Sequence, residues 1–319
     1  MSAPRAAVDV GSNSVRLLVV DGDGRRLTRE MTITRLAAGV DATGRFDDAA
    51  LERTLATIAR YRDVWRGYGA TDRVRIAATS AVRDAADRDR FFTGVRAVAG
   101  VDAEVLSGEE EATLAFLGAA RAVDVASPTA VIDIGGGSTE LIVGNGDGTI
   151  AGSVSLQLGC VRLTERHLVD DPPSDAEVAA ARAMVQERLE EADRLLAGQG
   201  ADLARMAGLV VVAGTATTLG ALHLGLTAYE ESKIHGSRIP AAGLAALAER
   251  LVAMPTGQRA ALGPMQPGRE DVIHGGALVL AEVVARYGFA EVVVSEADNL
   301  DGLVASLASP PPPRGPRSG

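Results

Sequence analysis

Cysteine is almost absent from this chain, because Cys160 is the single one among 319 residues. A lone cysteine excludes an internal disulfide and a cysteine-rich metal site, and a single buried cysteine is usually a small apolar residue rather than a catalytic thiol. No stretch approaches the roughly 18 consecutive apolar residues that a membrane span requires, and the N-terminus reaches Asp9 without an apolar signal-peptide core. We therefore expect a cytoplasmic protein without a membrane partner.

Lysine and aromatic residues are also scarce. Lys233 is the single lysine, so nearly all of the 32 basic residues are arginines, whose planar forks suit phosphate oxygens; genomic base composition also accounts for this bias. Aromatic residues make up 3% of the chain, which leaves little surface for stacking a nucleobase. The net charge of −10 argues against a general nucleic-acid-binding surface, so no nucleic-acid partner is expected. If the ligand is a polyanion, the basic residues that bind it must therefore be gathered at the binding site.

One segment of the chain occurs twice. The sixteen residues 9–24 recur 124 positions later as residues 133–148. Each copy follows a short apolar run and leads into a second one, so each predicts a strand, a turn of small residues and another strand. A single copy could be an ordinary β-hairpin. However, the Asp-Gly pairs at 23–24 and 147–148 supply the tight hairpin turn later in each copy, so the longer, Ser-containing loops need another explanation.

The composition of the repeated loop favours phosphate binding. Consecutive N–H groups in such a turn form a concavity that binds anions. Asp9 and Asp133 each end the first strand of a copy, and a carboxylate there suits a divalent cation held against the anion. Two copies that face each other would hold phosphate from both sides. The residues expected to cradle phosphate are Gly11, Ser12, Asn13 and Ser14 in the first copy and Gly135, Gly136, Gly137 and Ser138 in the second.

The remaining pattern predicts two α/β halves. A chain of this length with 47% hydrophobic residues can bury a substantial core and form two domains. In the first half, apolar periodicity predicts three strands within 5–36, strands at 74–78 and 103–106, and helices at 47–66, 84–99 and 109–123. In the second half it predicts strands between 129 and 158, at 209–213 and at 291–294, and helices at 161–168, 175–197, 215–225, 240–253 and 270–286.

The domain border falls near residues 123–127, where the second copy restarts the pattern. We predict one domain at 1–124, completed by a C-terminal helix at 299–309, and a second at 125–298. The Pro-rich end at 310–319 cannot bury a core and is expected to be disordered.

Several short motifs lie at the ends of the predicted strands, and each alone is weak. Glu109 to Glu111 could simply favour a helix N-terminus, Arg83 could be a surface charge, and Gly214-Thr215 a helix start. Taken in order, the motifs resemble the exopolyphosphatase and guanosine pentaphosphate phosphohydrolase family of the actin-like ATPase superfold, from residue 5 to about 305. They are Asp9-x-Gly-Ser-Asn-Ser14, Ala78-Thr-Ser-Ala-x-Arg83, Ser107-Gly-x-Glu-Glu-Ala112, Asp133-Ile-Gly-Gly-Gly-Ser-Thr-Glu140, Gly159-Cys-Val161, Gly214-Thr215 and Arg269-x-Asp-x-Ile-x-Gly275.

The resemblance implies an α/β fold of two duplicated actin-like, ribonuclease H-like domains that flank an interdomain cleft. It implies hydrolysis of the terminal phosphate of polyphosphate with Mg²⁺ or Mn²⁺. Glu111 matches the catalytic glutamate, which would deprotonate the attacking water, and Arg83 would neutralise charge on the phosphoryl group. The acids that match metal-binding positions are Asp133 and Glu140, with Asp9 as their counterpart in the first loop, and Gly214 and Thr215 match further phosphate contacts.

The chain departs from the family pattern in two places. Residues 295–302 lack the arginine that often precedes the closing acid-Gly pair, so substrate contacts there are expected to differ. The chain also ends where longer members continue into a helical domain that adds polymer-binding surface. A preference for short polyphosphate is therefore expected, unless a homodimer aligns two clefts.

Three alternatives to an exopolyphosphatase remain open. Hydrolysis of guanosine pentaphosphate breaks the same kind of bond in a (p)ppGpp-type substrate. An ATP-dependent kinase of the same superfold would tend to carry a Lys or a Thr pair in its first loop, where this chain has Ser12-Asn13-Ser14. A non-catalytic phosphate or alarmone sensor would most simply have lost one of the acids Glu111, Asp133 and Glu140, which are all present.

Overall fold

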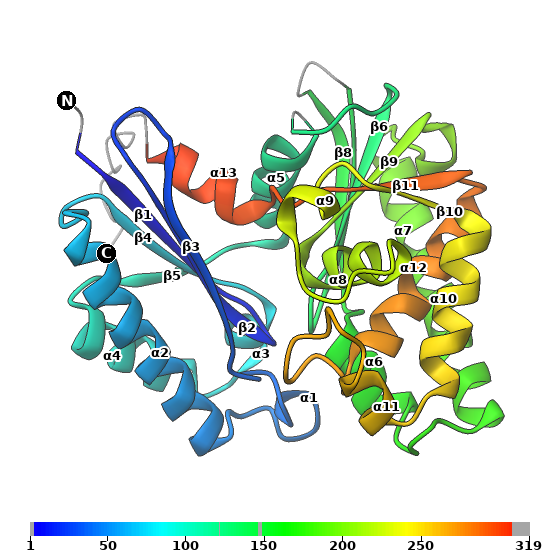
Figure 1. Cartoon of the computed structure of the whole chain (residues 1–319), viewed down its shortest axis with the longest axis horizontal. Helices are drawn as coiled ribbons and strands as arrows, with labels where there is room; N and C mark the ends of the chain where they lie inside the picture. The colour runs from blue at the N-terminus through cyan, green and yellow to red at the C-terminus, as the bar shows by residue number, and fades with distance from the viewer. Residues whose placement is uncertain (1–2, 121, 146–148, 308–319) are drawn as a thin grey trace.

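The two copies of the repeated loop belong to two separate β-sheets (Figure 1). The computed structural model describes residues 3–120, 122–145 and 149–307. The first sheet has the order β3-β2-β1-β4-β5, and the second has the order β10-β11-β9-β6-β7-β8. The strands of the first sheet are β1 (Arg5–Val10), β2 (Ser14–Val20), β3 (Arg26–Ile33), β4 (Val74–Ala78) and β5 (Ala103–Val105). Those of the second are β6 (Thr129–Ile134), β7 (Thr139–Gly144), β8 (Ile150–Leu156), β9 (Gly208–Val212), β10 (Arg238–Pro240) and β11 (Glu291–Val294).

The two sheets share one topology, which extends the sequence repeat to the whole fold. In the first, β2 is antiparallel to β1 and β3, and β4 is parallel to β1 and β5. In the second, β7 is antiparallel to β6 and β8, and β9 is parallel to β6 and β11. Strand β10 is an addition that pairs antiparallel with β11. The predicted duplicated α/β fold, as expected for the actin-like superfold, is confirmed.

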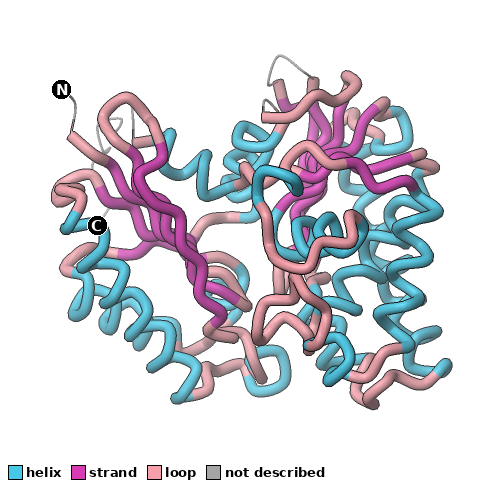
Figure 2. Tube along the Cα trace, viewed as in Figure 1, coloured by secondary structure: helices cyan, strands magenta, loops and turns pink. Residues whose placement is uncertain are grey.

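Helices cover the outer face of each sheet, as Figure 2 shows by element type. Against the first sheet, α2 contributes Ile58 and Trp65, and α4 contributes Phe91. Against the second, the larger core takes most of its helical residues from a second set of helices. The first set is α2 (Asp48–Gly67) and α4 (Arg88–Ala99), and the second is α6 (Cys160–His167), α7 (Asp175–Gly198), α8 (Ala213–His223), α10 (Ala241–Ala253) and α12 (Ile273–Tyr287).

Two helices cross between the sheets and cover their inner faces (Figure 1). Helix α5 (Gly108–Ala119) comes from the first half but buries Phe116 against the second sheet. Helix α13 (Asn299–Ser306) comes from the end of the chain but buries Leu300 against the first sheet. The helices touch closely, because a Cβ on Gly118 would overlap the Asp298 carbonyl, and one on Gly302 would lie 2.5 Å from the Leu114 carbonyl oxygen. The domain borders at 124 and 298 stay predictions.

The structure corrects several predicted boundaries. The helix predicted at 84–99 begins only at Arg88, as α4, and Asp84 instead ends the separate helix α3 (Ser80–Asp84), because Ala85 takes an extended backbone. The helix predicted at 109–123 ends at Ala119, and the one predicted from 270 begins at Ile273, after the left-handed Gly268. Periodicity missed the shortest elements, which hold too few residues to show a period: α1 (Val40–Thr43), α9 (Glu231–Ile234), α11 (Thr256–Ala260), the 3-10 turn η1 (Leu203–Arg205) and β10.

Some expectations fall outside the part of the chain that the structure describes. These are the tail at 310–319, the turn at 147–148 and the last residues of the helix predicted at 299–309. Within the described residues, no helix combines the length and the apolar character that crossing a membrane requires.

Candidate active site

A cleft of about 490 Å³ lies between the two sheets and gathers most of the predicted site. Both repeated loops line it, together with the start of α5 and the start of α8. The predicted residues that line the cleft are Asp9, Gly11, Ser12, Asn13, Ser14, Glu111, Asp133, Gly135, Gly136, Ser138, Gly214 and Thr215. Arg83, Gly137 and Glu140 do not line it.

The two loops are held by the same local hydrogen bonds. Within the first loop, the Gly11 N–H donates to the Ser14 carbonyl at 2.9 Å, and within the second the Gly135 N–H donates to the Ser138 carbonyl at 3.0 Å. Each loop is also held from behind through a carbonyl. Gly136 accepts from the Val161 N–H at 2.9 Å, and Ser12 accepts from the amide of residue 37 at 2.8 Å. The repeat in sequence is therefore a repeat in detailed structure.

The loops meet face to face across the cleft. A Cβ built on Gly136 would lie 2.7 Å from the Ser12 Cβ, and one built on Gly137 would lie 2.8 Å from the Ser80 Oγ. Ser12 Oγ and Ser80 Oγ are themselves hydrogen-bonded at 2.9 Å. The second loop can approach the first this closely because glycine stands at both positions.

The acids of the two loops have opposite cross-strand partners. Asp9 on β1 pairs in register with Arg16 on β2, and Asp9 Oδ2 accepts from Arg16 Nε at 2.9 Å and Nη2 at 2.6 Å. Asp133 on β6 pairs in register with Glu140 on β7. Like charges placed directly opposite destabilise a sheet. The first loop thus carries a neutralised acid, and the second carries two acids that repel each other.

Burial and this repulsion act on the second pair together. Burial, followed by the neighbouring Glu140, raises the pKa of Asp133 well above its usual range. Burial also raises the pKa of Glu140, although Ser155 Oγ donates to its Oε1 at 2.7 Å. The other Glu140 oxygen, like Asp9 Oδ1 and Glu111 Oε2, is buried without a hydrogen-bond partner. Each of these oxygens can bind a cation, a proton or a hydrogen-bond donor.

A hard divalent cation fits this oxygen-only environment. Within residues 3–120, 122–145 and 149–307, no three His, Cys, Asp or Glu side chains are grouped so that they could hold a metal ion by themselves. Magnesium commonly binds through one or two carboxylates and completes its shell with phosphate oxygens and water. The Asp133–Glu140 pair suits that mode better than Asp9, whose charge Arg16 already balances.

The structure separates the three consecutive glutamates at the start of α5. Ser107 caps the helix by accepting from the Glu110 N–H at 3.1 Å, and Glu110 Oε2 accepts in return from the Ser107 N–H at 2.9 Å. Glu109 and Glu110 are exposed, whereas Glu111 is 6% exposed and lines the cleft. The spacing Ser107-x-x-Glu110 is a capping-box signature, so it could have assigned Glu110 to the cap from the sequence.

Glu111 is buried among other acids. Burial first, and then the carboxylates of Glu140 and Asp133, raise the pKa of Glu111 well above its usual range. Arg83 opposes this shift, since its Nη1 lies 3.7 Å from Glu111 Oε2. The same Arg83 nitrogen donates to the Leu106 carbonyl at 2.9 Å. The structure therefore places Arg83 beside Glu111, behind the cleft wall.

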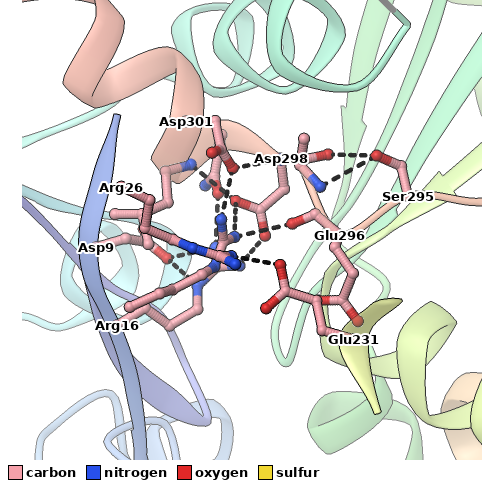
Figure 3. A network of polar contacts seen from close by, with 12 residues as sticks. Asp9, Arg16, Arg26, Glu231, Ser295, Glu296, Asp298 and Asp301 are labelled. Carbon is pink, nitrogen blue, oxygen red and sulfur yellow. Dashed lines mark hydrogen bonds and ion pairs between the residues drawn. The ribbon is translucent and has the colours of Figure 1, made fainter. Parts of the chain in front are cut away.

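A network of arginines and acids that the sequence did not reveal (Figure 3) includes Arg16, Arg29 and Asp298, which line the cleft. Arg16 pairs with Asp9 and also with Asp298, and its Nη2 donates to Asn299 Oδ1 at 2.6 Å. Arg29 Nη1 donates to Asp301 Oδ2 at 2.8 Å. Although burial opposes ionisation, Arg16 and Arg29 outweigh it and lower the pKa of Asp298. The network ties the sheet of the first half to the start of α13.

Arg269, known so far only as part of a motif, lines the cleft as a buried cation. It is 8% exposed, its Nε has no hydrogen-bond partner, and burial lowers its pKa. The guanidinium lies directly over Gly214, since a Cβ at that position would overlap it. Glycine at 214 therefore leaves room for the Arg269 guanidinium.

The cleft as a whole is acidic rather than basic. The Arg16 and Arg29 charges are already paired with acids, so the expected local cations are present but largely compensated. The charged residues that line the cleft are three arginines, Arg16, Arg29 and Arg269, and seven acids, Asp9, Glu30, Glu111, Asp133, Glu231, Glu296 and Asp298.

Comparison with known proteins gives consistent matches across the chain. The model of the Ppx/GppA phosphatase family matches residues 18–308. Exopolyphosphatase 2 of Mycobacterium tuberculosis is 46% identical over 320 positions, which cover 95% of this chain and 98% of that protein. A guanosine-5'-triphosphate,3'-diphosphate pyrophosphatase of Pseudoalteromonas atlantica is 40% identical over 191 residues, 56% of this chain and 37% of that protein. The crystal structure of an exopolyphosphatase-like protein, 35% identical, superimposes with a TM-score of 0.90 over 96% of this chain and 99% of that one.

Proposed function

We propose that this chain, which belongs to the Ppx/GppA phosphatase family, is an exopolyphosphatase that releases orthophosphate from the end of inorganic polyphosphate. The position of Glu111 carries the proposal, because a buried carboxylate at the start of α5 lines the cleft together with both phosphate-type loops. The 46% identity to a mycobacterial exopolyphosphatase over nearly the full length of both chains supports the same activity.

In the proposed reaction, Glu111 accepts a proton from the water that attacks the terminal phosphorus. The new bond joins water oxygen to phosphorus, and the bridging oxygen leaves with the shortened chain. A base works best when its pKa lies near the operating pH, and burial moves the pKa of Glu111 in that direction. Arg83, beside Glu111, would hold this carboxylate in place and supply positive charge near the reacting group.

The two loops bind the phosphate in this proposal. Backbone N–H groups and hydroxyls from residues 11–14 and 135–138 would donate to its oxygens, with Gly214 and Thr215 as further contacts. Arg269 would face the same oxygens, because its buried guanidinium lines the cleft and its Nε has no hydrogen-bond partner. Mg²⁺ or Mn²⁺, held by Asp133 and Glu140 with support from Asp9, would neutralise phosphate charge and polarise the phosphorus–oxygen bonds when bound.

The acidic cleft also bears on the length of the substrate. Seven acids and three arginines line it, so a polyanion must enter with its own divalent cations. Affinity for a polyanion grows with the number of charges that are neutralised together. Only Arg269 among these cations is free of an acid partner in the described residues. We therefore propose a preference for short polyphosphate chains. We also propose that the enzyme is cytoplasmic. A homodimer would extend the phosphate-binding surface by aligning two clefts.

One assay tests the activity directly. Orthophosphate release is measured from short polyphosphate, long polyphosphate, guanosine pentaphosphate and ATP, with the wild type and with Glu111→Gln. Glu110→Gln is the matched control, since its side chain only caps α5. The proposal expects short polyphosphate to be the preferred substrate and Glu111→Gln to be the impaired variant. Equal release by wild type and Glu111→Gln would reject the role of this residue.

Hydrolysis of guanosine pentaphosphate is the second candidate, and the Pseudoalteromonas relative is the observation that favours it. Recognition of guanine would need a stacking surface. Tyr229 is the single aromatic residue that lines the described cleft, and its hydroxyl already donates to Glu296. This arrangement favours the simple polymer.

A further inference from the structure

Arg162 joins the second phosphate loop to the opposite half of the molecule. It stands in α6, directly after the Gly159-Cys-Val161 motif, and its side chain is 11% exposed. Its Nε donates to the carbonyl of Gly137 at 2.8 Å. Its Nη2 donates to Asp84 Oδ2 at 2.6 Å, and its Nη1 pairs with Asp41. One guanidinium therefore contacts the loop and two acids from the first half.

The start of α6 holds the second loop through its carbonyls. The N–H groups of Cys160 and Arg162 donate to the carbonyls of Gly135 and Gly136 at 2.9 and 3.1 Å. The Arg162 side chain extends this series to Gly137. A displacement of this side chain therefore acts on the loop that would bind phosphate.

The acids bound to Arg162 belong to the side of the cleft that faces the second loop. Asp84 ends α3, the helix whose Ser80 touches Ser12 of the first loop. The Gly137 Cα faces Ser80 and Ser12, while its carbonyl faces Arg162. The second loop is thus held between the first half on one side and Arg162 on the other. The same guanidinium would lose both acids if the two sides of the cleft moved apart.

We propose that Arg162 is a positioning residue that couples closure of the cleft to the conformation of the 135–138 loop. In the structure Asp84 and Asp41 bind the guanidinium, and the guanidinium donates to the Gly137 carbonyl. On opening, the side chain loses its two charged partners, so its hold on Gly137 weakens and the loop relaxes. The loop is then ordered for phosphate only when the cleft is closed. The activity part of this inference rests on the proposed function.

The test uses Asp84→Asn, because Asp84 bonds to Arg162 but does not line the cleft. Amide hydrogen exchange is followed at residues 160–162, whose N–H groups bond to the loop, without any substrate. Binding of inorganic tripolyphosphate is measured in parallel. We expect Asp84→Asn to speed exchange and to weaken tripolyphosphate binding about tenfold, the effect of losing one charge-assisted hydrogen bond. Exchange and binding within twofold of wild type would overturn the proposal.

Arg166→Gln is the matched control. Arg166 also pairs with Asp41, but its side chain is 43% exposed and it donates to no loop carbonyl among the described residues. Exposed pairs contribute little, so we expect this variant to stay within twofold of wild type in both measurements. An effect of Arg166→Gln as large as that of Asp84→Asn would mean that any contact between the halves matters, which contradicts a specific role of Arg162.

A double-mutant cycle completes the design. If Asp84 acts through Arg162, adding Asp84→Asn to Arg162→Gln leaves exchange and binding unchanged, whereas effects that multiply would reject the coupling. Arg162→Lys keeps the positive charge but loses the planar guanidinium group. It should therefore recover less than half of the affinity for tripolyphosphate that Arg162→Gln loses. In turnover, KM for tripolyphosphate should rise more than kcat falls. If wild type neither binds nor cleaves tripolyphosphate, the proposed function fails, while hydrogen exchange still decides the coupling.

Discussion

Replacing Gly136 by alanine would place a methyl group between the two phosphate loops. The new Cβ would lie 2.7 Å from the Ser12 Cβ and 3.2 Å from Val161 Cγ2. Carbon atoms pack best at about 3.5–4.0 Å, so the loops would have to separate by about 1 Å. A misplacement of about 1 Å can cost about 100-fold in rate. We therefore expect phosphate release from short polyphosphate to fall about 100-fold in kcat.

Two further variants separate this steric effect from a general loss of stability. Gly67→Ala adds a methyl at the end of α2, where nothing lies within 4 Å, so its turnover and melting temperature should match or exceed those of wild type. Ser12→Gly removes the atom that the new methyl would meet. The loss of turnover in the double variant Gly136→Ala/Ser12→Gly should therefore be smaller than the product of the two single losses. A Gly136→Ala enzyme with near-normal kcat would refute the idea that the loops must touch during turnover.

Four further predictions concern the base, the metal, a partly buried acid and the helix crossing. Glu111→Gln should lower kcat by about 10²–10⁴-fold, while Glu110→Gln keeps at least half of it. Excess chelator should abolish phosphate release and added Mg²⁺ should restore it; full activity in chelator would remove the metal from the proposal. Burial raises the pKa of Glu296 to about 7, so the folded state favours the neutral acid and loses stability as pH rises past the unfolded value toward 7. Glu296→Gln should therefore gain melting temperature over wild type at about pH 8 and show a smaller gain at about pH 5; an equal gain at both would contradict this sign. Gly118→Ala should destabilise the protein by about 1–3 kcal/mol through overpacking against α13, and an unchanged denaturant midpoint would show that the crossing helices can move apart.

The sequence repeat predicted the architecture because each copy joins the first two strands of a sheet. Asp9 and Asp133 each stand one residue before the end of the central strands β1 and β6, so two copies of the loop imply two copies of the topology. The predicted family, fold and class of enzyme, a hydrolase of phosphoric anhydrides, are confirmed by the family match and the near full-length relative. The roles of the individual site residues stay predictions.

The partners of the acids could not be predicted from the sequence. Arg16 contacts Asp298 across 282 positions, and no local pattern encodes a pair that only the crossing of α13 brings together. The difference in charge between the two loops, in contrast, could have been predicted from the sequence. The residue seven positions after each aspartate is Arg16 in one copy and Glu140 in the other, and cross-strand register makes it the direct partner. Aligning the copies through the second strand would have revealed this difference.

The exchange of α5 and α13 between the sheets has a consequence for biosynthesis. The inner face of the first sheet is covered by Leu300, Leu303 and Val304, which the ribosome adds long after β5 is complete. The nascent first half therefore exposes an apolar sheet face throughout translation of the second half, while α5 has nothing to cover until β6 and β7 emerge. Neither half is therefore expected to fold on its own as it leaves the ribosome. Chaperone dependence during synthesis, and the failure of fragments cut near residue 124 to become stable when expressed alone, are the expected results.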